Sequence, residues 1–278
     1  MTQLGGCPVG FKVGYEGCIA VSVESFVLKF ANRAMELLHF HYGSVTSTND
    51  IARELLRDYP AVLVSALYQT HGRGRHGRSW FGEWGKNVYC TIGIQQSQST
   101  LLTHIAAPLA FGAVVVWDTL TTLVGVAPIF LLKYPNDLLG RCPDGAWRKL
   151  SGVLVERTVV GQVHACLIGI GINVQQRDFP PSLATEATSL ALLGFELTPE
   201  RVLQQLKRTA ESLCESSPRE LLQRWRALLQ IEGRLLRIQG KHGLWKAVAL
   251  HDSGQLEVEQ GGERLLISDG DSLRYVLD

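Results

Sequence analysis

The pattern of hydrophobic and polar residues predicts strands and helices that alternate along most of the chain. Short apolar runs bounded by polar or glycine-rich segments are typical of buried strands, and they occur at residues 61–68, 87–94, 128–132, 148–156 and 163–173. Apolar residues at helical spacing predict helices at about 104–124, 199–213 and 218–229. This mixture is typical of a globular α/β protein.

The two ends of the chain differ from this middle part. Residues 1–40 carry little pattern beyond a helical spacing of apolar residues at 30–38, which predicts a short helix. After Gly233, short alternating runs are separated by Gly and Asp turn signals, as in a small antiparallel β-barrel. We therefore predict an N-terminal extension of unknown role at 1–40, a central domain at 41–232 and a C-terminal β module at 233–278.

Composition and charge narrow the class of protein. The 278 residues are 46% hydrophobic and carry a net charge of +1, so no general attraction to DNA, RNA or an anionic membrane is expected. The six cysteines are scattered without a C-x-x-C pair. This spacing indicates reduced, structural thiols in a reducing compartment, with Cys90 and Cys166 inside strands.

The sequence predicts a cytoplasmic protein. Its N-terminus has no basic segment followed by an apolar one, so we expect no signal peptide. The longest apolar stretch, residues 105–117, contains Pro108 and ends at Asp118. It is too short to span a bilayer and is interpreted as a buried helix.

The candidate chemistry centres on residues 69–80, QTHGRGRHGRSW, which we call the arginine loop. Its glycines let the backbone approach a ligand closely, and its three guanidinium groups suit carboxylate and phosphate oxygens. Taken alone, such a segment is equally typical of a flexible linker or a nonspecific RNA-binding tract. Because it is short, follows a predicted strand and lies in a chain that is not basic, we interpret it as one wall of an anion site.

Three further segments carry polar groups next to predicted elements. Ser47-Thr48-Asn49 precedes a helical run, where Ser47 with Asp50 predicts a capping box, although a helix N-terminus also suits a polar ligand. The turn from Lys133 to Asp137 offers one phosphate contact and one Mg²⁺ contact, or is simply a type I turn. Lys149 opens a strand, where most lysines are merely solvated. The run 169–173 (GIGIN) predicts a bulge or a close backbone approach at its glycines and a polar tip at Asn173.

These segments occur in one order that is specific as a set. They are Ser47-Thr48-Asn49, the arginine loop ending at Trp80, residues 133–137 (KYPND), and residues 149–156 (KLSGVLVE) followed by 169–173. Together they resemble the biotin protein ligase (biotin–[acetyl-CoA carboxylase] ligase) family over about residues 40–278. The resemblance implies a mixed β-sheet flanked by helices, of the class II synthetase-like kind, with a C-terminal SH3-like β-barrel.

The resemblance also implies an activity and its residues. Biotin and ATP would form biotinoyl-5′-AMP, and a lysine of a biotin carboxyl carrier protein would then take the biotinoyl group. Lys149, Arg75 and Asp137 would be catalytic, with Mg²⁺ at Asp137. The biotin site would hold Ser47, Thr48, Asn49, Gln69, Arg73, Gly74, Arg75 and Lys149, and the ATP site Trp80, Lys133, Asn136 and Asn173. The partner would be the carrier of a biotin-dependent carboxylase, with no DNA or membrane partner and with a homodimer as one option.

Three departures from the family pattern accompany the match. Tyr134 stands where the family usually has Trp, His76 replaces what is often a basic or small residue, and the polar excursion at 140–147 is long. No DNA-binding segment is recognisable, so the resemblance implies a catalytic form without a repressor role. The alternatives are a lipoate or octanoate ligase or transferase of the same fold, which generally lacks the arginine loop, and a non-catalytic biotin-binding module.

Overall fold

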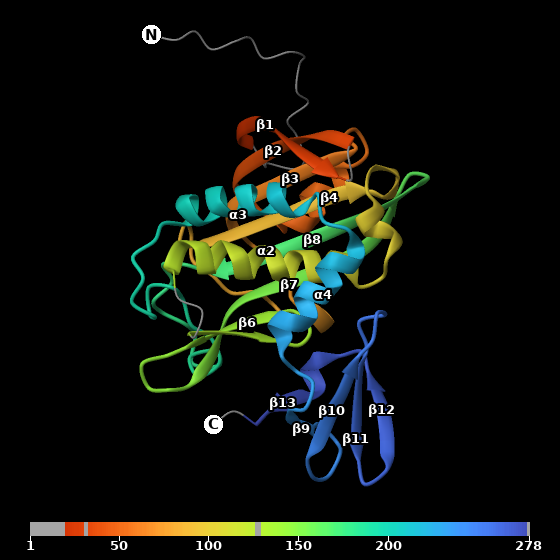
Figure 1. Ribbon diagram of the computed structural model, residues 1–278. Helices are drawn as coiled ribbons and strands as arrows, with labels where there is room; N and C mark the ends of the chain where they lie inside the picture. Colours follow the sequence, from red (N-terminus) through yellow and green to blue (C-terminus); the bar gives the residue numbers. More distant parts are fainter. Residues whose placement is uncertain (1–19, 31–32, 126–128, 277–278) are drawn as a thin grey trace.

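The chain forms a large mixed sheet with helices on both faces and a smaller sheet at its C-terminal end (Figure 1). The computed structural model describes residues 20–30, 33–125 and 129–276. Pro128, at the start of one predicted strand, lies outside the described residues, as do Cys7 and Cys18.

The large sheet has eight strands. Their order is β1 (Ala20–Phe30), β2 (Arg33–Val45), β3 (Ala61–Gln69), β4 (Asn87–Gln95), β8 (Val163–Asn173), β7 (Trp147–Val160), β6 (Asp137–Arg141) and β5 (Phe130–Lys133). Neighbours pair antiparallel except β2 and β3, which are parallel. The mixed sheet is confirmed, and the predicted strands at 61–68, 87–94 and 163–173 match β3, β4 and β8 within one residue.

The helix predicted at 30–38 is wrong, because the described residues of this segment, 30 and 33–38, belong to β1 and β2. Its spacing of apolar residues is overridden by the pairing of residues 33–38 with β1, and β2 pairs with β3 only from Leu38 onward. Along β2, Leu37 packs into one core cluster and Phe40 and Tyr42 into another, which is the period-two pattern of a strand. The predicted boundary at residue 40 therefore falls within a strand of the large sheet.

The two faces of the large sheet carry different helices. Helices α2 (Ala107–Val124), α3 (Pro199–Leu213) and α4 (Pro218–Leu229) cover one face (Figure 1). Helix α1 (Thr48–Leu55) packs on β3, β4 and β8 from the other. The three predicted helices are thus confirmed. In β8, Ile168, Ile170 and Ile172 point into the core under α2, so by strand alternation Gly169 and Gly171 face the α1 side.

Helix α2 is long and apolar enough to cross a membrane by length and composition, but 61% of this stretch is buried inside the fold. It packs against α3, α4, β7 and β8. The helix is therefore the central core element that the sequence predicted. Cys90 and Cys166 lie in β4 and β8 as expected, and burial raises the pKa of each thiol to about 12.

The C-terminal module is a five-stranded antiparallel sheet, as predicted. Its order is β12 (Glu263–Ile267), β11 (Leu256–Gln260), β10 (Trp245–Leu250), β9 (Leu235–Ile238) and β13 (Leu273–Tyr275). Tyr134 ties this module to the large sheet, because its hydroxyl lies 2.8 Å from the carbonyl oxygen of Gly254 and 2.9 Å from that of Ile267. Tyr134, which stands where the family usually has Trp, thus joins the C-terminal module to the large sheet.

Candidate active site

A cavity of about 180 Å³ opens on the α1 side of the large sheet. It is lined by the start of α1, the arginine loop, the turn before β6, strands β7 and β8, and the connector at 179–187. Every predicted site residue but one lies on its wall: Ser47, Thr48, Asn49, Gln69, Arg73, Gly74, Arg75, Trp80, Asn136, Asp137, Lys149 and Asn173. The exception is Lys133, which lies at the end of β5 behind the cavity wall.

The start of α1 presents polar groups to the cavity. Ser47 occupies the N-cap position, but its side chain makes no capping hydrogen bond, so the predicted capping box is wrong. Gln69 caps the helix instead, since its Oε1 accepts a 2.8 Å hydrogen bond from the backbone N–H of Thr48. The hydroxyl of Ser47 is thereby left on the cavity wall rather than used by the helix.

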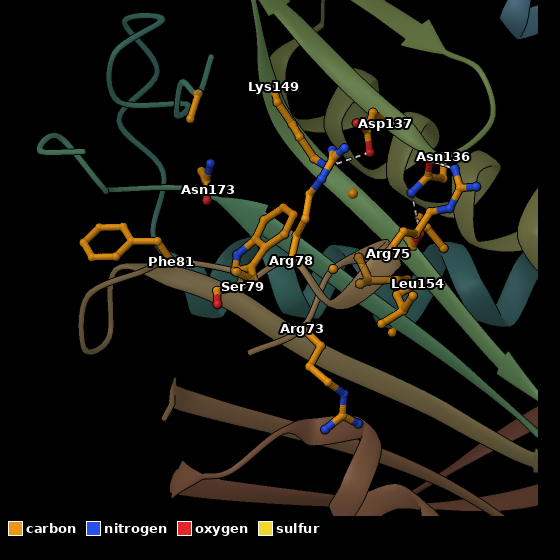
Figure 2. Close-up of a pocket in the computed structure, with 18 of the residues that line it drawn as sticks. Arg73, Arg75, Arg78, Ser79, Phe81, Asn136, Asp137, Lys149, Leu154 and Asn173 are labelled. Carbon is orange, nitrogen blue, oxygen red and sulfur yellow. Dashed lines mark hydrogen bonds and ion pairs between the residues drawn. The ribbon is translucent and has the colours of Figure 1, made fainter. Parts of the chain in front are cut away.

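Asp50 does not complete the capping box because it binds two arginines. Arg73 donates a bidentate pair to its carboxylate at 2.6 and 2.7 Å, and Arg53 donates at 2.9 Å. The hydrogen bond from Arg73 is the main cause that lowers the pKa of Asp50. Figure 2 shows the side chain of Arg73 directed away from Lys149 and Arg75, so this arginine anchors the base of the arginine loop to α1.

Lys149 lies on the opposite wall. Its Nζ is 2.7 Å from Oδ1 of Asp137 (Figure 2) and 5.3 Å from the ring centroid of Trp80. The connector fixes its backbone, because Lys149 donates to the carbonyl of Glu186 at 2.7 Å and accepts from the N–H of Thr188 at 2.9 Å. The ammonium group is thus held at a defined place in the cavity.

Arg75 bridges two segments at the cavity mouth. Its guanidinium donates to Oδ1 of Asn136 at 3.2 Å and to Oδ1 of Asp269 at 2.9 Å. Asn136 is fixed in turn by donating to the carbonyl of Val153 on β7 at 2.8 Å. Arg75 contacts Asn136, and Lys149 contacts the next residue, Asp137. The two cationic side chains therefore lie on the wall of the same cavity.

Glycines form the floor on which these side chains lie. A Cβ atom added at Gly171 would be 2.8 Å from the ring of Trp80, and one at Gly169 would be 2.5 Å from Oδ1 of Asn49. Of the two predicted alternatives at these glycines, the close approach is confirmed and the bulge is not, since the pairing of β8 runs through both without a register shift. Within the described part of the chain, Nε1 of Trp80 and Oδ1 of Asn173 are buried without a hydrogen-bond partner, so each can bond to a ligand in the cavity.

Sequence reasoning missed several residues around the cavity. Thr91 lies on β4 with its Oγ1 2.8 Å from Oγ1 of Thr48 and 2.6 Å from Oδ1 of Asn49, which orients both. Glu156 bonds to Asn49 and Arg53. Asp269 and Asp271 come from the C-terminal module. A single threonine such as Thr91 in an apolar strand is not part of any functional motif. Glu156, Asp269 and Asp271 contact residues that are far away in the sequence, so no local pattern predicts these contacts.

Comparisons with known proteins agree with this geometry. A model of the biotin/lipoate A/B protein ligase family matches residues 42–173. The biotin–[acetyl-CoA-carboxylase] ligase of Mycobacterium tuberculosis (strain ATCC 25618 / H37Rv) is 30% identical over 223 residues, which cover 77% of this chain and 79% of the relative. This chain belongs to the biotin protein ligase family.

Other members of the biotin protein ligase family extend the match. The bifunctional ligase/repressor BirA of Bacillus subtilis (strain 168) is 30% identical over 269 residues, which cover 91% of this chain and 79% of the relative. The structure of the biotin protein ligase from Aquifex aeolicus in complex with biotin and ATP has a TM-score of 0.65 at 26% identity, covering 85% of this chain and 98% of that one. The fold that the sequence resemblance implied is confirmed.

Proposed function

We propose that this chain is a biotin protein ligase that works in two half-reactions within the cavity. A carboxylate oxygen of biotin attacks the α-phosphorus of ATP, the bond to the β-phosphate breaks, and pyrophosphate leaves. The amine of an acceptor lysine then attacks the carbonyl carbon of biotinoyl-5′-AMP, AMP leaves and the amine loses a proton. The observation that carries this proposal is the cavity in which Lys149 and Arg75 face the polar start of α1.

Two cations are what the first half-reaction needs. A carboxylate and a triphosphate repel each other, and negative charge grows on the oxygens around the α-phosphorus as the new bond forms. The ammonium group of Lys149 contacts the biotin carboxylate and the α-phosphate and offsets their charge. Arg75 holds the adenylate and excludes water from it. Both side chains are already fixed by Asp137, Asn136 and Asp269, so little reorganisation is needed.

The biotin end of the cavity lies at the start of α1. Ser47, Thr48, Asn49 and Gln69 offer hydroxyl and amide groups to the ureido ring, with Arg73 and Gly74 on the loop that covers it. Thr91 and Glu156 hold Thr48 and Asn49 in place from behind. These hydrogen bonds therefore orient the polar groups that are proposed to bind biotin.

The nucleotide end lies near Trp80 and Asn173. Their buried, unpartnered Nε1 and Oδ1 atoms offer one donor and one acceptor to a base or ribose, and Asn136 adds an amide. Lys133 contributes charge from behind Asp137 rather than contact, since it lies off the cavity wall. Burial lowers the pKa of Lys133, and the carboxylate of Asp137 counteracts that shift.

Asp137 also suits Mg²⁺, which usually keeps several waters and takes one or two protein carboxylates plus substrate phosphates. Its carboxylate lies on the cavity wall beside Lys149, so it can face a bound nucleotide. Bound there with ATP, the ion would offset charge on the departing pyrophosphate.

The acceptor is proposed to be the biotin carboxyl carrier protein of a biotin-dependent carboxylase, and the compartment the cytoplasm. Relatives of this chain carry acetyl-CoA-carboxylase in their names. The described cysteines Cys90, Cys142, Cys166 and Cys214 are all free thiols, in keeping with a reducing compartment.

ATP–pyrophosphate exchange tests the proposal, with biotin, lipoate and octanoate supplied separately to the purified chain. We expect exchange with biotin alone, followed by label transfer to one lysine of a carrier domain. Exchange driven by lipoate or octanoate would replace the substrate assignment. Tight biotin binding without any exchange would instead identify a binding module.

A further inference from the structure

The arginine loop is a small hairpin held at two places. Its own backbone is bonded, with Gly74 donating to the carbonyl of Arg78 at 2.7 Å and Trp80 to that of Gly72 at 2.8 Å. The base is fixed to α1 through Arg73 and Asp50. The tip is held by a different part of the chain, almost two hundred positions further on.

That second holder is the turn Asp269-Gly270-Asp271, which we call the acidic turn. Asp269 accepts from Arg75 at 2.9 Å, and Asp271 accepts from Arg78 at 3.2 Å. His76 places its Nε2 3.2 Å from a carboxylate oxygen of each. Burial opposes ionisation of Asp269, but hydrogen bonds from the N–H of Asp271 and from His76, together with the charge of Arg75, lower its pKa.

The backbone of the loop tip is set to make these contacts. His76 has φ 54° and ψ 33°, the left-handed region that residues with a side chain seldom adopt. The left-handed conformation brings the imidazole to the acidic turn, and the neighbouring Gly77, at φ 72°, lets the chain turn back. A strained conformation of this kind persists when surrounding contacts hold it.

The acidic turn is itself docked tightly on the catalytic domain. A Cβ added at Gly270 would lie 2.3 Å from the carbonyl oxygen of Tyr134, so the turn packs directly on the segment that leads to Asn136 and Asp137. The hydroxyl of Tyr275 accepts a 2.9 Å hydrogen bond from the N–H of Tyr134. Arg75 therefore spans two parts whose relative position is fixed. It contacts Asn136 on one side (Figure 2) and Asp269 on the other.

We propose that Asp269 of the C-terminal module is a positioning residue that holds Arg75, and with it the arginine loop, over the cavity. The C-terminal module thus completes the active site rather than merely following it. Without Asp269, Arg75 keeps only Asn136, and the loop tip is held only through Asp271. The tip would therefore be open for a larger fraction of the time, and substrate binding would have to close it again. The apparent affinity for ATP would fall in proportion to the closed fraction, whereas the rate of the closed complex would be unchanged.

The test compares Asp269→Asn with two matched variants of the full-length chain. Asp269→Glu keeps the charge. Asp252→Asn removes another contact between the C-terminal module and the catalytic domain, the 2.7 Å ion pair with Arg226, without touching the loop. Hydrogen–deuterium exchange of peptides that cover residues 70–80 is measured without ligands, together with the steady-state kinetics of ATP–pyrophosphate exchange.

For Asp269→Asn we expect about fivefold faster amide exchange in the loop, as loss of one partly exposed charged contact allows, and a similar rise in KM for ATP with kcat within about twofold. Asp269→Glu and Asp252→Asn should match the wild type. Unchanged loop exchange in Asp269→Asn, or an equal effect of Asp252→Asn, would overturn the proposal. The kinetic part depends on the proposed function, but the amide-exchange measurement does not, so a chain inactive with biotin still tests the role of Asp269.

Discussion

Replacing Lys149 by methionine removes the cation placed between Asp137 and the ring of Trp80 while keeping most of the side-chain volume. We expect adenylate formation to fall by about two to three orders of magnitude, the usual range for loss of one group that stabilises developing charge. The fold should persist, because Lys149 is 35% exposed and its ion pair contributes at most about 1 kcal/mol.

The size of the effect follows from the charges around the cavity. Arg73 is matched by Asp50, Arg75 by Asp269, Arg78 by Asp271 and Lys149 by Asp137. Without the ammonium group, the carboxylate of Asp137 would face the incoming anions uncompensated. At a separation of about 5 Å and an effective dielectric constant of about 20, this repulsion is about 3 kcal/mol, which corresponds to more than a hundredfold in rate.

The assay is single-turnover formation of biotinoyl-5′-AMP from labelled ATP, with thermal unfolding measured on the same preparation. Lys246→Met, at an exposed position of strand β10, is the control for loss of a lysine elsewhere. A rate for Lys149→Met within tenfold of the wild type would refute the electrostatic reasoning. A drop in Tm by more than about 5 °C would show instead that the pair with Asp137 supports the fold.

Three further outcomes follow from the structure. Gly171→Ala should displace Trp80, whose ring lies 2.8 Å from the added Cβ, and raise KM for ATP at least tenfold in exchange kinetics; an unchanged KM would contradict the packed floor. Arg75→Gly should release biotinoyl-5′-AMP and label lysines of unrelated proteins, which mass spectrometry of a bystander protein would detect; labelling of the carrier alone would argue against retention by Arg75. Burial lowers the pKa of His39 to about 4, below its unfolded value, so protonation favours the unfolded chain and stability falls from pH 6.5 towards 4. Urea unfolding should lose about 2 kcal/mol between pH 7.5 and 5 relative to His39→Gln, and equal slopes for the two proteins would rule this out.

The polar cluster around His39 shows why such a property lies beyond sequence reasoning. His39 and His41 both reach Oγ of Ser65, at 2.7 and 2.8 Å, because β2 runs parallel to β3 in that register. Nothing local in the sequence marks either histidine. The segment just before them, with apolar residues at helical spacing, even predicted the wrong element, because a spacing that suits a helix was overridden by pairing with β1.

The sequence by itself determined the elements whose pattern is strong and local. Continuous apolar runs produced β3, β4 and β8, and the Pro-started helical periods produced α3 and α4, because burial of an apolar face depends on residues only a few positions apart. The ordered set of motifs also identified the family. The structure shows the physical reason for the set, because each motif supplies one wall of the same cavity.

Only the tertiary structure decided how these walls meet. Gln69 rather than Ser47 caps α1, Glu186 and Thr188 fix the backbone of Lys149, and Asp269 holds Arg75 from the far end of the chain. These contacts join residues that are distant in sequence, and their partners are chosen by sheet order and by the docking of the C-terminal module. A charge or an amide can be recognised in a sequence, but its partner is set by which surfaces the folded chain brings together.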